Sequence, residues 1–309
     1  MTDQLNLIYS NTVEEIFANL HLRGTIFFRS EMAPPWGMQL ARVAFPRFHV
    51  SIKGGCVIGI SGQEEVVQVE EMEIAMLGQG EEHWIADRKG RDLIPSEKAG
   101  EACLQGVPLF QEGLKTNKLI CGLMRFDATV NHPILHSFPK VLHLSKINAS
   151  SALWRIAETI DAMADEVGSK PSAVMDRLTE ALFIEIIKTY TADQKPVGFF
   201  AALKDPRLSQ ALAHLHNDIQ EPWTIDMLAQ KVGVSRSSLV RQFNTTIGMG
   251  PIQYLSQWRM IRAKEMLSNS NASLDLIAEQ VGFASAQSFA RAFRRQFGIS
   301  PGYLRKVRS

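Results

Sequence analysis

Two histidines and a cysteine in the first third of the chain could bind a metal ion or a small molecule. His49 and Cys56 are close in sequence, and His83 follows on a later strand-like segment. Imidazole nitrogen and thiolate sulfur are ligands that zinc accepts, and a zinc site needs three or four of them. Otherwise the two imidazoles would be polar anchors for a small organic ligand in an apolar pocket, with Trp36 at its mouth. We expect the metal-free pocket.

Arginines at helical spacing occur in the last third of the chain, inside a segment that repeats itself. Residues 226–243 and 275–293 share one pattern, offset by 49 positions before a short turn and by 50 after it. In each copy a small residue stands four positions before a glycine, and a bulky apolar residue follows on the next segment. This spacing lets two helices cross closely around a turn with positive φ, which is typical of a helix-turn-helix. Ser235 and Ser285 are placed to cap the second helix of each copy.

The exposed face of each second helix holds the side chains that could contact DNA, because the apolar side packs inward. We expect Leu239 and Phe243 to face inward in the first copy, and Phe289, Phe293 and Phe297 in the second. The remaining side chains of the N-terminal half would face a major groove. These are Arg236, Ser237, Val240 and Arg241 in the first copy and Ala286, Gln287, Ala290 and Arg291 in the second.

The arginines of these helices are expected to have two different roles. Arginine suits a bidentate contact to guanine, so Arg241 and Arg291 would be the primary base readers. Arg294 and Arg295 would neutralise phosphates, which positions a protein on DNA without reading sequence. For any single arginine the alternative is a solvated helix face. For the two helices together, DNA binding is the favoured interpretation.

The charge distribution agrees with a nucleic-acid-binding part. The chain has 309 residues, of which 45% are hydrophobic and 21% charged, as expected for a globular protein of two domains. Residues 201–309 contain 14 Lys and Arg against 7 Asp and Glu, whereas residues 1–200 contain 19 against 25. A basic module joined to an acidic one is typical of a nucleic-acid binder with a second domain that stays off the phosphates. Solvated surface charge could produce part of this asymmetry.

The sequence predicts a cytoplasmic protein that does not bind membranes. It starts without a basic leader and an apolar run, and no segment approaches the ~18 to 20 apolar residues that a membrane span needs. The three cysteines, Cys56, Cys103 and Cys121, are odd in number and far apart, which favours reduced thiols over a disulfide framework.

Hydrophobic periodicity changes along the chain. Short strand-like runs separated by glycines occupy residues 25–77 and return at 119–144, which favours a sandwich or barrel. Residues 88–117 lose this periodicity, and we expect a long surface excursion there. From residue 151 the period is helical and predicts a pair of helices over 151–190.

The predicted domains are residues 1–195 and 196–309. A helix is expected at residues 13–20, and the best linker candidate is 191–198. Between the two copies of the repeat, residues 251–267 read as one long helix, which at 1.5 Å per residue would be a spacer of about 25 Å.

The repeat resembles the DNA-binding domain of the AraC/XylS-family transcription regulators from about residue 205 onward. The resemblance rests on the duplicated helix-turn-helix with Gly282-Phe283, Phe289, Phe293 and Gly298-Ile-Ser-Pro301. The first half is similar, less specifically, to the cupin-like sensor domain of one branch of that family. The matching motifs, in order, are Pro34-Pro35-Trp36-Gly37, Phe48-His49, Gly54-Gly-Cys56, Gly80-x-x-His83, Cys121-Gly122 and His132-Pro133.

The resemblance implies an α+β protein: a cupin-like β-barrel with a helical pair, followed by an all-α domain of two helix-turn-helix motifs joined by a long helix. The implied function is a sequence-specific, ligand-responsive transcription regulator. The partners that the resemblance implies are double-stranded DNA, an unknown small-molecule effector, a second copy of the chain in a homodimer, and RNA polymerase if the protein is an activator.

The alternative function is a metal-dependent cupin enzyme with an accessory DNA-binding domain. Metal-binding cupins use His-x-His, an acidic residue and a late histidine, whereas here the second histidine is replaced in the run His49-Val50-Ser51. Cys56 lies in the region of the acid, and His83 is the late histidine. We therefore expect no enzyme activity and no cofactor, with zinc on His49, Cys56 and His83 as the remaining metal hypothesis.

Overall fold

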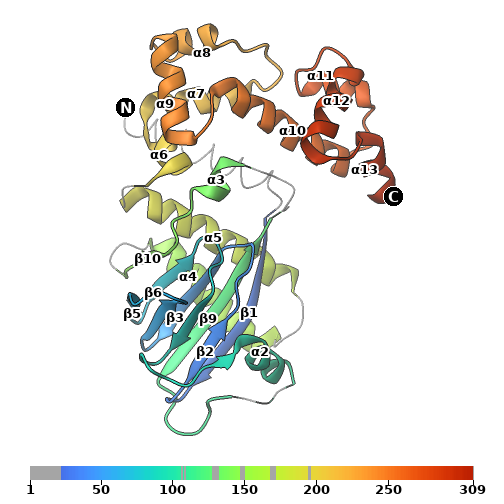
Figure 1. Cartoon of the computed structure of the whole chain (residues 1–309). Coiled ribbons are helices and arrows are strands. Elements are labelled where there is room, and N and C mark those ends of the chain that lie inside the picture. Colours follow the sequence, from blue (N-terminus) through green and yellow to red (C-terminus); the bar gives the residue numbers. More distant parts are fainter. Residues whose placement is uncertain are drawn as a thin grey trace. The chain divides into compact units, whose positions relative to one another are not determined.

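Two compact units make up the chain (Figure 1). The structure is a computed structural model, and it describes residues 22–105, 107, 109–126, 132–146, 150–167, 172–193 and 196–308. The helix expected at residues 13–20 lies outside the described residues. Below, the sheet unit is the described part of residues 22–126 and 138–194. The helical unit is residues 132–137 and 196–308, so a short segment between two strands groups with the C-terminal helices.

The sheet unit contains two five-stranded sheets, in the orders β1-β9-β3-β6-β10 and β5-β4-β7-β2-β8. This confirms the double-sheet architecture expected from the short strand-like runs. The strands are β1 (Arg23–Met32), β2 (Gly37–Leu40), β3 (Arg47–Lys53), β4 (Cys56–Ile60), β5 (Val66–Val69), β6 (Glu73–Leu77), β7 (His83–Ala86), β8 (Ile94–Pro95), β9 (Asn117–Arg125) and β10 (Leu142–Leu144).

Strand β3 has buried side chains on both faces of its sheet. Successive side chains of a strand point to opposite faces. Arg47, His49 and Ser51 therefore share the face that meets the second sheet, where the imidazole of His49 contacts that of His83 on β7. Phe48 and Val50 point the other way. All five residues are buried, which explains why this strand lacks the alternation of a half-exposed sheet.

The segment expected to be a long surface excursion contains regular structure. Strand β8 and helix α2 (Ser96–Leu104) lie within residues 88–117, so the prediction of a loop over this whole segment was wrong. Strand β8 has only two residues, and the one residue of α2 that is fully buried is Ala99 among those whose burial is described. Such short elements produce no periodic signal, because their packing against β2 is what defines them.

The predicted helical pair is present as α4 (Ser151–Val167) and α5 (Ala173–Asp193). Helix α5 packs on β1, and α4 packs on α5. Asp161 of α4 accepts from Arg29 on β1 at 2.9 Å and from Lys118 on β9 at 2.6 Å. These contacts hold the pair on the sheet that contains β1 and β9.

The helical unit contains the two expected helix-turn-helix motifs, formed by α8 with α9 and by α11 with α12. Its helices are α3 (Pro133–His136), α6 (Gly198–Lys204), α7 (Pro206–Asn217), α8 (Ile225–Lys231), α9 (Arg236–Ile247), α10 (Pro251–Asn269), α11 (Leu274–Gln280), α12 (Ala286–Phe297) and α13 (Pro301–Arg308). No helix in the described part of the chain is both long enough and apolar enough to cross a membrane.

Both motifs turn through a glycine with positive φ, Gly233 at 69° and Gly282 at 75°. Each second helix starts where the predicted serine caps it, since Ser235 and Ser285 each accept from the backbone N–H three residues on, at 3.2 Å. Both helices end on a left-handed glycine. The duplicated sequence thus folds into a duplicated local structure.

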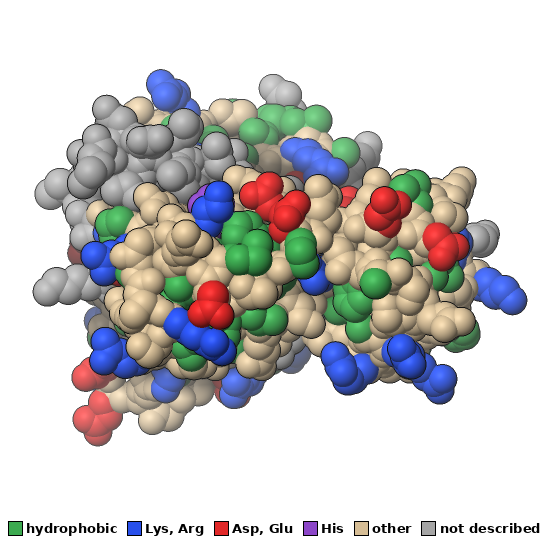
Figure 2. Space-filling model, turned by 90° about the horizontal axis from the view of Figure 1, so that it is seen from above, with side chains coloured by type: hydrophobic (Ala, Val, Ile, Leu, Met, Phe, Trp, Pro, Cys, Tyr) green, Lys and Arg blue, Asp and Glu red, His purple; other side chains and the backbone are tan. Residues whose placement is uncertain are grey.

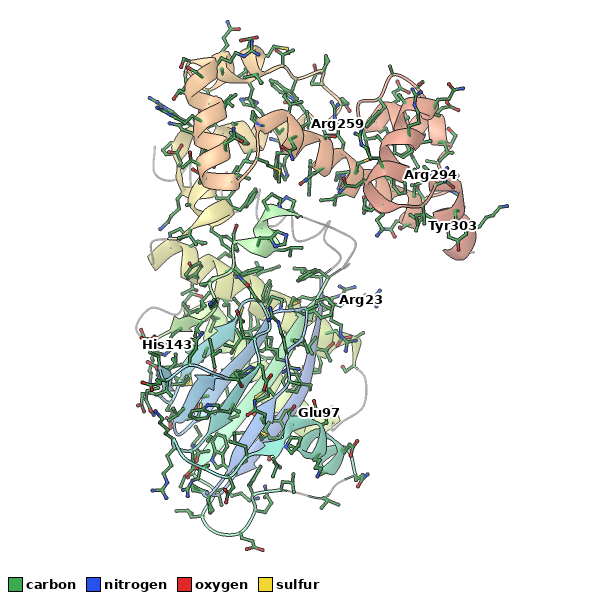
Figure 3. The ribbon with its side chains drawn as sticks, viewed as in Figure 1. Arg23, Glu97, His143, Arg259, Arg294 and Tyr303 are labelled. Carbon is green, nitrogen blue, oxygen red and sulfur yellow. The ribbon has the colours of Figure 1, made fainter. Side chains whose placement is uncertain are left out.

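Helix α10 joins the two motifs, and its Arg259 contacts both the loop before α8 and the turn of the second motif. Arg259 donates through Nε to the carbonyl of Ile219 at 2.9 Å and through Nη2 to that of Glu221 at 2.7 Å. The same guanidinium lies against the turn of the second motif, because a Cβ added at Gly282 would be 2.5 Å from Nη2. Figure 3 shows Arg259 on this helix.

The segment that joins β9 to β10 is anchored in the helical unit by His132. The backbone N–H of Ile134 donates to His132 Nδ1 at 3.2 Å, so the neutral ring carries its proton on Nε2. That Nε2–H donates to the hydroxyl of Tyr254 at 3.1 Å, and the hydroxyl donates to His216 Nε2 at 2.6 Å. Burial holds the pKa of His132 well below its usual range, which keeps this hydrogen-bond chain neutral.

Candidate nucleic-acid interface and ligand site

Helix α9 presents the candidate residues of the first copy on one face. Leu239, Phe243 and Ile247 are buried against the rest of the motif, as the periodicity predicted for the first two. Arg236, Ser237 and Arg241 are exposed, and Val240 is half-buried between them. These residues line an open surface depression of about 680 Å³. Its lining residues are Ile225, Ser235, Arg236, Ser237, Val240 and Arg241.

Helix α12 repeats this arrangement with different side chains. Phe289 and Phe293 are fully buried, while Phe297 is half-buried and its ring packs at a tilt against that of Phe293, 4.6 Å between ring centroids. Gln287 and Arg291 are exposed, and the small side chains at 286 and 290 are half-buried. The same face continues to Arg294 and Arg295, which are exposed in the last turn. Figure 3 labels Arg294.

One ion pair distinguishes the two copies. Arg236 Nη1 lies 3.3 Å from Asp226 Oδ2, and both side chains are largely exposed. The counterpart of Arg236 in the second copy is Ala286, so Asp275 has no arginine at that place. Figure 2 shows Lys and Arg side chains along the lower right edge of the face in view, where few Asp or Glu side chains lie beside them. The start of the first recognition helix thus carries an arginine and an ion pair that the start of the second lacks.

The interior of the sheet unit contains a chain of hydrogen bonds through two imidazoles. His83 Nδ1 lies 2.7 Å from the carbonyl oxygen of Glu81 and must donate to it, which leaves His83 Nε2 as an acceptor. His49 Nε2–H therefore donates to His83 Nε2 at 2.8 Å. His49 Nδ1 then accepts from the thiol of Cys121 at 3.0 Å. The side chains of His83, His49 and Cys121 are thus neutral and joined by hydrogen bonds.

The surroundings keep these groups neutral. Burial lowers the pKa of His49 well below its usual range and that of His83 to about 4. Burial also raises the pKa of the Cys121 thiol well above its usual range, and that of Cys56 to about 12. Neither buried thiol is therefore a reactive thiolate near neutral pH.

The predicted ligand-binding residues are only partly brought together. His49 and His83 meet, but the thiol that joins them is Cys121 on the neighbouring strand, not Cys56. Trp36 is buried and donates its indole N–H to Asn117 at 3.2 Å. The carbonyl of Trp36 accepts from the backbone N–H of Asp87, which follows His83 by four residues. Four residues span about 13 Å in an extended strand, so Trp36 is not beside the two imidazoles.

Cys121 could have been suspected from the sequence only through its place in the Cys-Gly motif. Its pairing with His49 depends on the register of β3 against β9, in which these two residues are direct partners. The two strands are separated by more than sixty residues. Local spacing favoured Cys56, because it is the nearer of the two in sequence.

The residues do not fit the zinc site considered above. In the part of the chain that is described, no three His, Cys, Asp or Glu side chains are grouped so as to hold a metal ion. His49 uses both ring nitrogens in hydrogen bonds, and one ion can take only one of them. The 2.8 Å between the two Nε2 atoms is also shorter than the about 3.3 Å between two nitrogen ligands of a tetrahedral zinc ion.

The lowered pKa of His83 predicts an acid-sensitive fold. The unfolded state takes up a proton near pH 6.5, whereas the folded state does so near pH 4. The contribution of His83 to stability is therefore complete above pH 6.5 and is lost as pH falls towards 4, by about 3 kcal/mol in total. Urea unfolding between pH 7 and pH 4 should show this loss, and His83→Gln should reduce its slope by about one proton. A free energy of unfolding that stays level over this range would contradict the neutral hydrogen-bond chain.

Family comparisons match both parts of the chain. Residues 11–192 match the family described as Cupin, and residues 228–306 match the family described as Helix-turn-helix domain. The first match covers more than half of the chain.

Individual relatives are similar over nearly the whole length. A "Putative AraC-like transcription regulator" of Streptomyces antibioticus is 26% identical over 305 residues, which cover 95% of this chain and 98% of the relative. The "HTH-type transcriptional regulator AlkR" of Acinetobacter baylyi is 25% identical over 306 residues, covering 96% and 99%. Among solved structures, an AraC-type DNA-binding domain protein of Chromobacterium violaceum is 33% identical, covers 34% of this chain and 95% of its own, and has a TM-score of 0.33.

Proposed function

Because the chain belongs to the AraC-type transcription regulators with an N-terminal cupin domain, we propose that α9 and α12 read two sites on one double-stranded DNA segment. We further propose that a small ligand bound by the sheet unit controls this binding. The observation that carries the first proposal is the duplicated recognition helix, capped by Ser235 and Ser285 and exposing Arg241 and Arg291 at equivalent places.

The length of α10 supports reading of two successive major grooves by one chain. Its nineteen residues form a spacer of about 28 Å at 1.5 Å per residue. Successive major grooves on one face of DNA are about 34 Å apart. With the widths of the two motifs added, one chain can span both grooves, and a shorter spacing in the protein would bend the DNA towards it.

The chain path supports control of the helical unit by the sheet unit. Strands β9 and β10 belong to the sheet unit, but the segment between them includes His132 to Ser137, which pack in the helical unit. Ser137 accepts from the backbone N–H of Phe199 at 2.8 Å, and His132 bonds to Tyr254 on α10. A ligand that shifts β9 would thus act on the helix between the two motifs. A homodimer and a contact with RNA polymerase stay predictions from the sequence.

No observation favours the enzyme alternative. It would need a set of metal ligands, and the described residues contain no group of three that could hold an ion. The relatives are named as transcription regulators. We therefore propose no enzymatic activity for the chain.

Selection of binding sites from a random DNA library, followed by hydroxyl-radical footprinting, tests the proposal. We expect an asymmetric site with two half-sites on one face of the DNA, about one helical turn apart. The asymmetry follows from the different side chains of α9 and α12. Recovery of a single short site, or of no sequence preference, would contradict reading by both helices.

Asp226→Asn is expected to strengthen DNA binding about two- to fivefold. The change removes a negative charge near the phosphates and frees Arg236 from an exposed ion pair worth no more than about 1 kcal/mol. Fluorescence anisotropy at several salt concentrations should show a slope steeper by about one unit if Arg236 then contacts a phosphate. Asp275→Asn is the matched control, because it removes the same charge from the second copy and frees no arginine. Equal effects of the two substitutions would exclude a role for Arg236.

A further inference from the structure

Arg47 is a buried cation that has no acidic partner among the described residues. It begins β3, and only 8% of it is exposed. Nη1 donates to the carbonyl of Ala41 at 2.8 Å, and Cζ lies 5.6 Å from the ring centroid of Phe27. Nε is buried and has no hydrogen-bond partner. None of the ion pairs in the described part of the chain includes this guanidinium.

Such an arrangement is unfavourable for folding alone. The guanidinium carries five N–H donors and stays charged at any ordinary pH. Burial without a counter-ion removes the hydration of the guanidinium, and no ion pair compensates for that loss. Burial is also the largest cause that lowers the pKa of Arg47. Groups of this kind are retained where they serve binding at a cost in stability.

The neighbouring polar groups supply no negative charge. The chain through His49, His83 and Cys121 lies on the same inner layer, and its donors and acceptors satisfy one another while staying neutral. Glu97 of α2 is the acidic group that acts most strongly on Arg47, but Glu97 is exposed and forms no ion pair with it.

The remaining neighbours are apolar. Leu77 on β6 is the register partner of Arg47, so both side chains point to the same side of their sheet. Leu40 and Ile60 are register partners of His83 on the facing sheet. Phe27 is thus the aromatic side chain nearest to the guanidinium, and the apolar side chains at this end of the strands include Leu77 on the same sheet and Leu40 and Ile60 on the facing sheet.

We propose that Arg47 binds the carboxylate of a small monocarboxylic acid, whose apolar body lies between the two sheets beside Phe27, Leu40 and Leu77. The inference rests on the proposed ligand control and names the class of effector. A carboxylate accepts two parallel N–H bonds from one guanidinium and cancels its single charge. A phosphate dianion would leave excess charge buried, and a neutral ligand would leave the arginine without a counter-ion.

The position of Arg47 connects the ligand to the chain path towards the helical unit. Arg47 is also the register partner of Leu123, near the end of β9. After β9 ends at Arg125, the chain enters the segment that leads to His132. A carboxylate at Arg47 would therefore bind at the strand end from which the chain leaves the sheet unit.

The test measures melting temperatures of the full chain in carboxylate-free buffer and after addition of sodium acetate, butyrate or octanoate. Sodium chloride at equal ionic strength and the neutral amide butyramide are the controls. We expect at least one of the carboxylates, added at about ten times its dissociation constant, to raise the melting temperature by about 3 °C or more. Chloride and butyramide should not do so.

Variants of Arg47 assign the response to this residue. Arg47→Met should abolish it and should melt no lower than the parent without ligand, since the variant removes a buried charge. Arg47→Lys keeps the charge but not the bidentate geometry, so it should keep a weaker response and serves if the Met variant does not fold. Arg42→Met, at an exposed arginine nearby, should respond as the parent does.

Two outcomes would overturn the inference. One is the absence of any carboxylate-specific shift in the parent. The other is a shift that persists in Arg47→Met or, if that variant does not fold, a shift in Arg47→Lys as large as that of the parent. The DNA affinity of Arg47→Met for the selected site separates this result from the proposed function. Retained DNA binding with a lost carboxylate response supports both, whereas a parent that binds no DNA overturns the proposed function and leaves the carboxylate result standing.

Discussion

Replacement of both Arg241 and Arg291 by alanine is expected to weaken binding to the selected DNA site by about 2 to 6 kcal/mol. A bidentate contact between arginine and guanine contributes about 1 to 3 kcal/mol of discrimination, and the two residues lie on separate helices. Both side chains are exposed at equivalent places of α9 and α12, so their removal leaves the packed faces of Phe243 and Phe293 intact. The fold should therefore be unchanged while sequence preference is lost.

The single variants separate the contributions of the two helices. Arg241→Ala should relax base preference at one position in one half-site only, and Arg291→Ala should do so in the other. Arg295→Ala is the control, because loss of a phosphate contact should weaken binding to all sequences alike and lower the salt slope by about one unit. If Arg241→Ala binds every sequence as the parent does, α9 does not read bases.

Gly282→Ala is expected to destabilise the helical unit by about 4 kcal/mol, much more than Gly233→Ala. Both glycines have positive φ, which costs a residue with a side chain about 1 to 3 kcal/mol. Only at Gly282 does the new Cβ also collide, lying 2.5 Å from Arg259 Nη2 and 2.8 Å from the backbone oxygen of Gln220. A Cβ at Gly233 would have no other atom of the described residues within 4 Å, apart from its chain neighbours. Relief of the collision would displace Arg259 from the carbonyls that it holds.

Circular dichroism at 222 nm during urea unfolding measures the effect on the helices. Gly233→Ala should lose only the cost of the strained φ, about 1 to 3 kcal/mol. The additional loss in free energy of unfolding in Gly282→Ala measures the close packing of the second turn on α10. Equal losses in the two variants would mean that Arg259 does not hold the turn of the second motif against the loop before α8 as the contacts indicate.

The helix-turn-helix part could be predicted closely from the sequence because its determinants are local. The cap at Ser235 and the turn at Gly233 lie within a few residues of the helices that they define, and the duplicated pattern supplies each signal twice. Burial of Leu239 and Phe243 follows from the period of the same helix. The roles of the exposed arginines stay predictions.

The sheet unit was harder to predict from the sequence because its contacts depend on strand order. His49 meets Cys121 across a register that joins β3 to a strand much later in the chain, so Cys56 looked the better partner. His132 stands in a motif that resembles the cupin domain, but it packs against Tyr254 in the helical unit. Arg47 gave no signal at all, since a lone arginine at a strand start is usually solvated. Its burial appears only after the two sheets are placed face to face.

Insertion of about five base pairs between the two half-sites of the selected DNA tests the central claim most directly. The insertion moves one half-site to the opposite face of the DNA without changing any base that the protein reads. If α9 and α12 of one chain bind successive major grooves across the fixed length of α10, affinity should fall about tenfold or more, to that of a single half-site. Unchanged affinity, with both half-sites still protected in the footprint, would contradict reading of the DNA by two rigidly spaced helices of one chain.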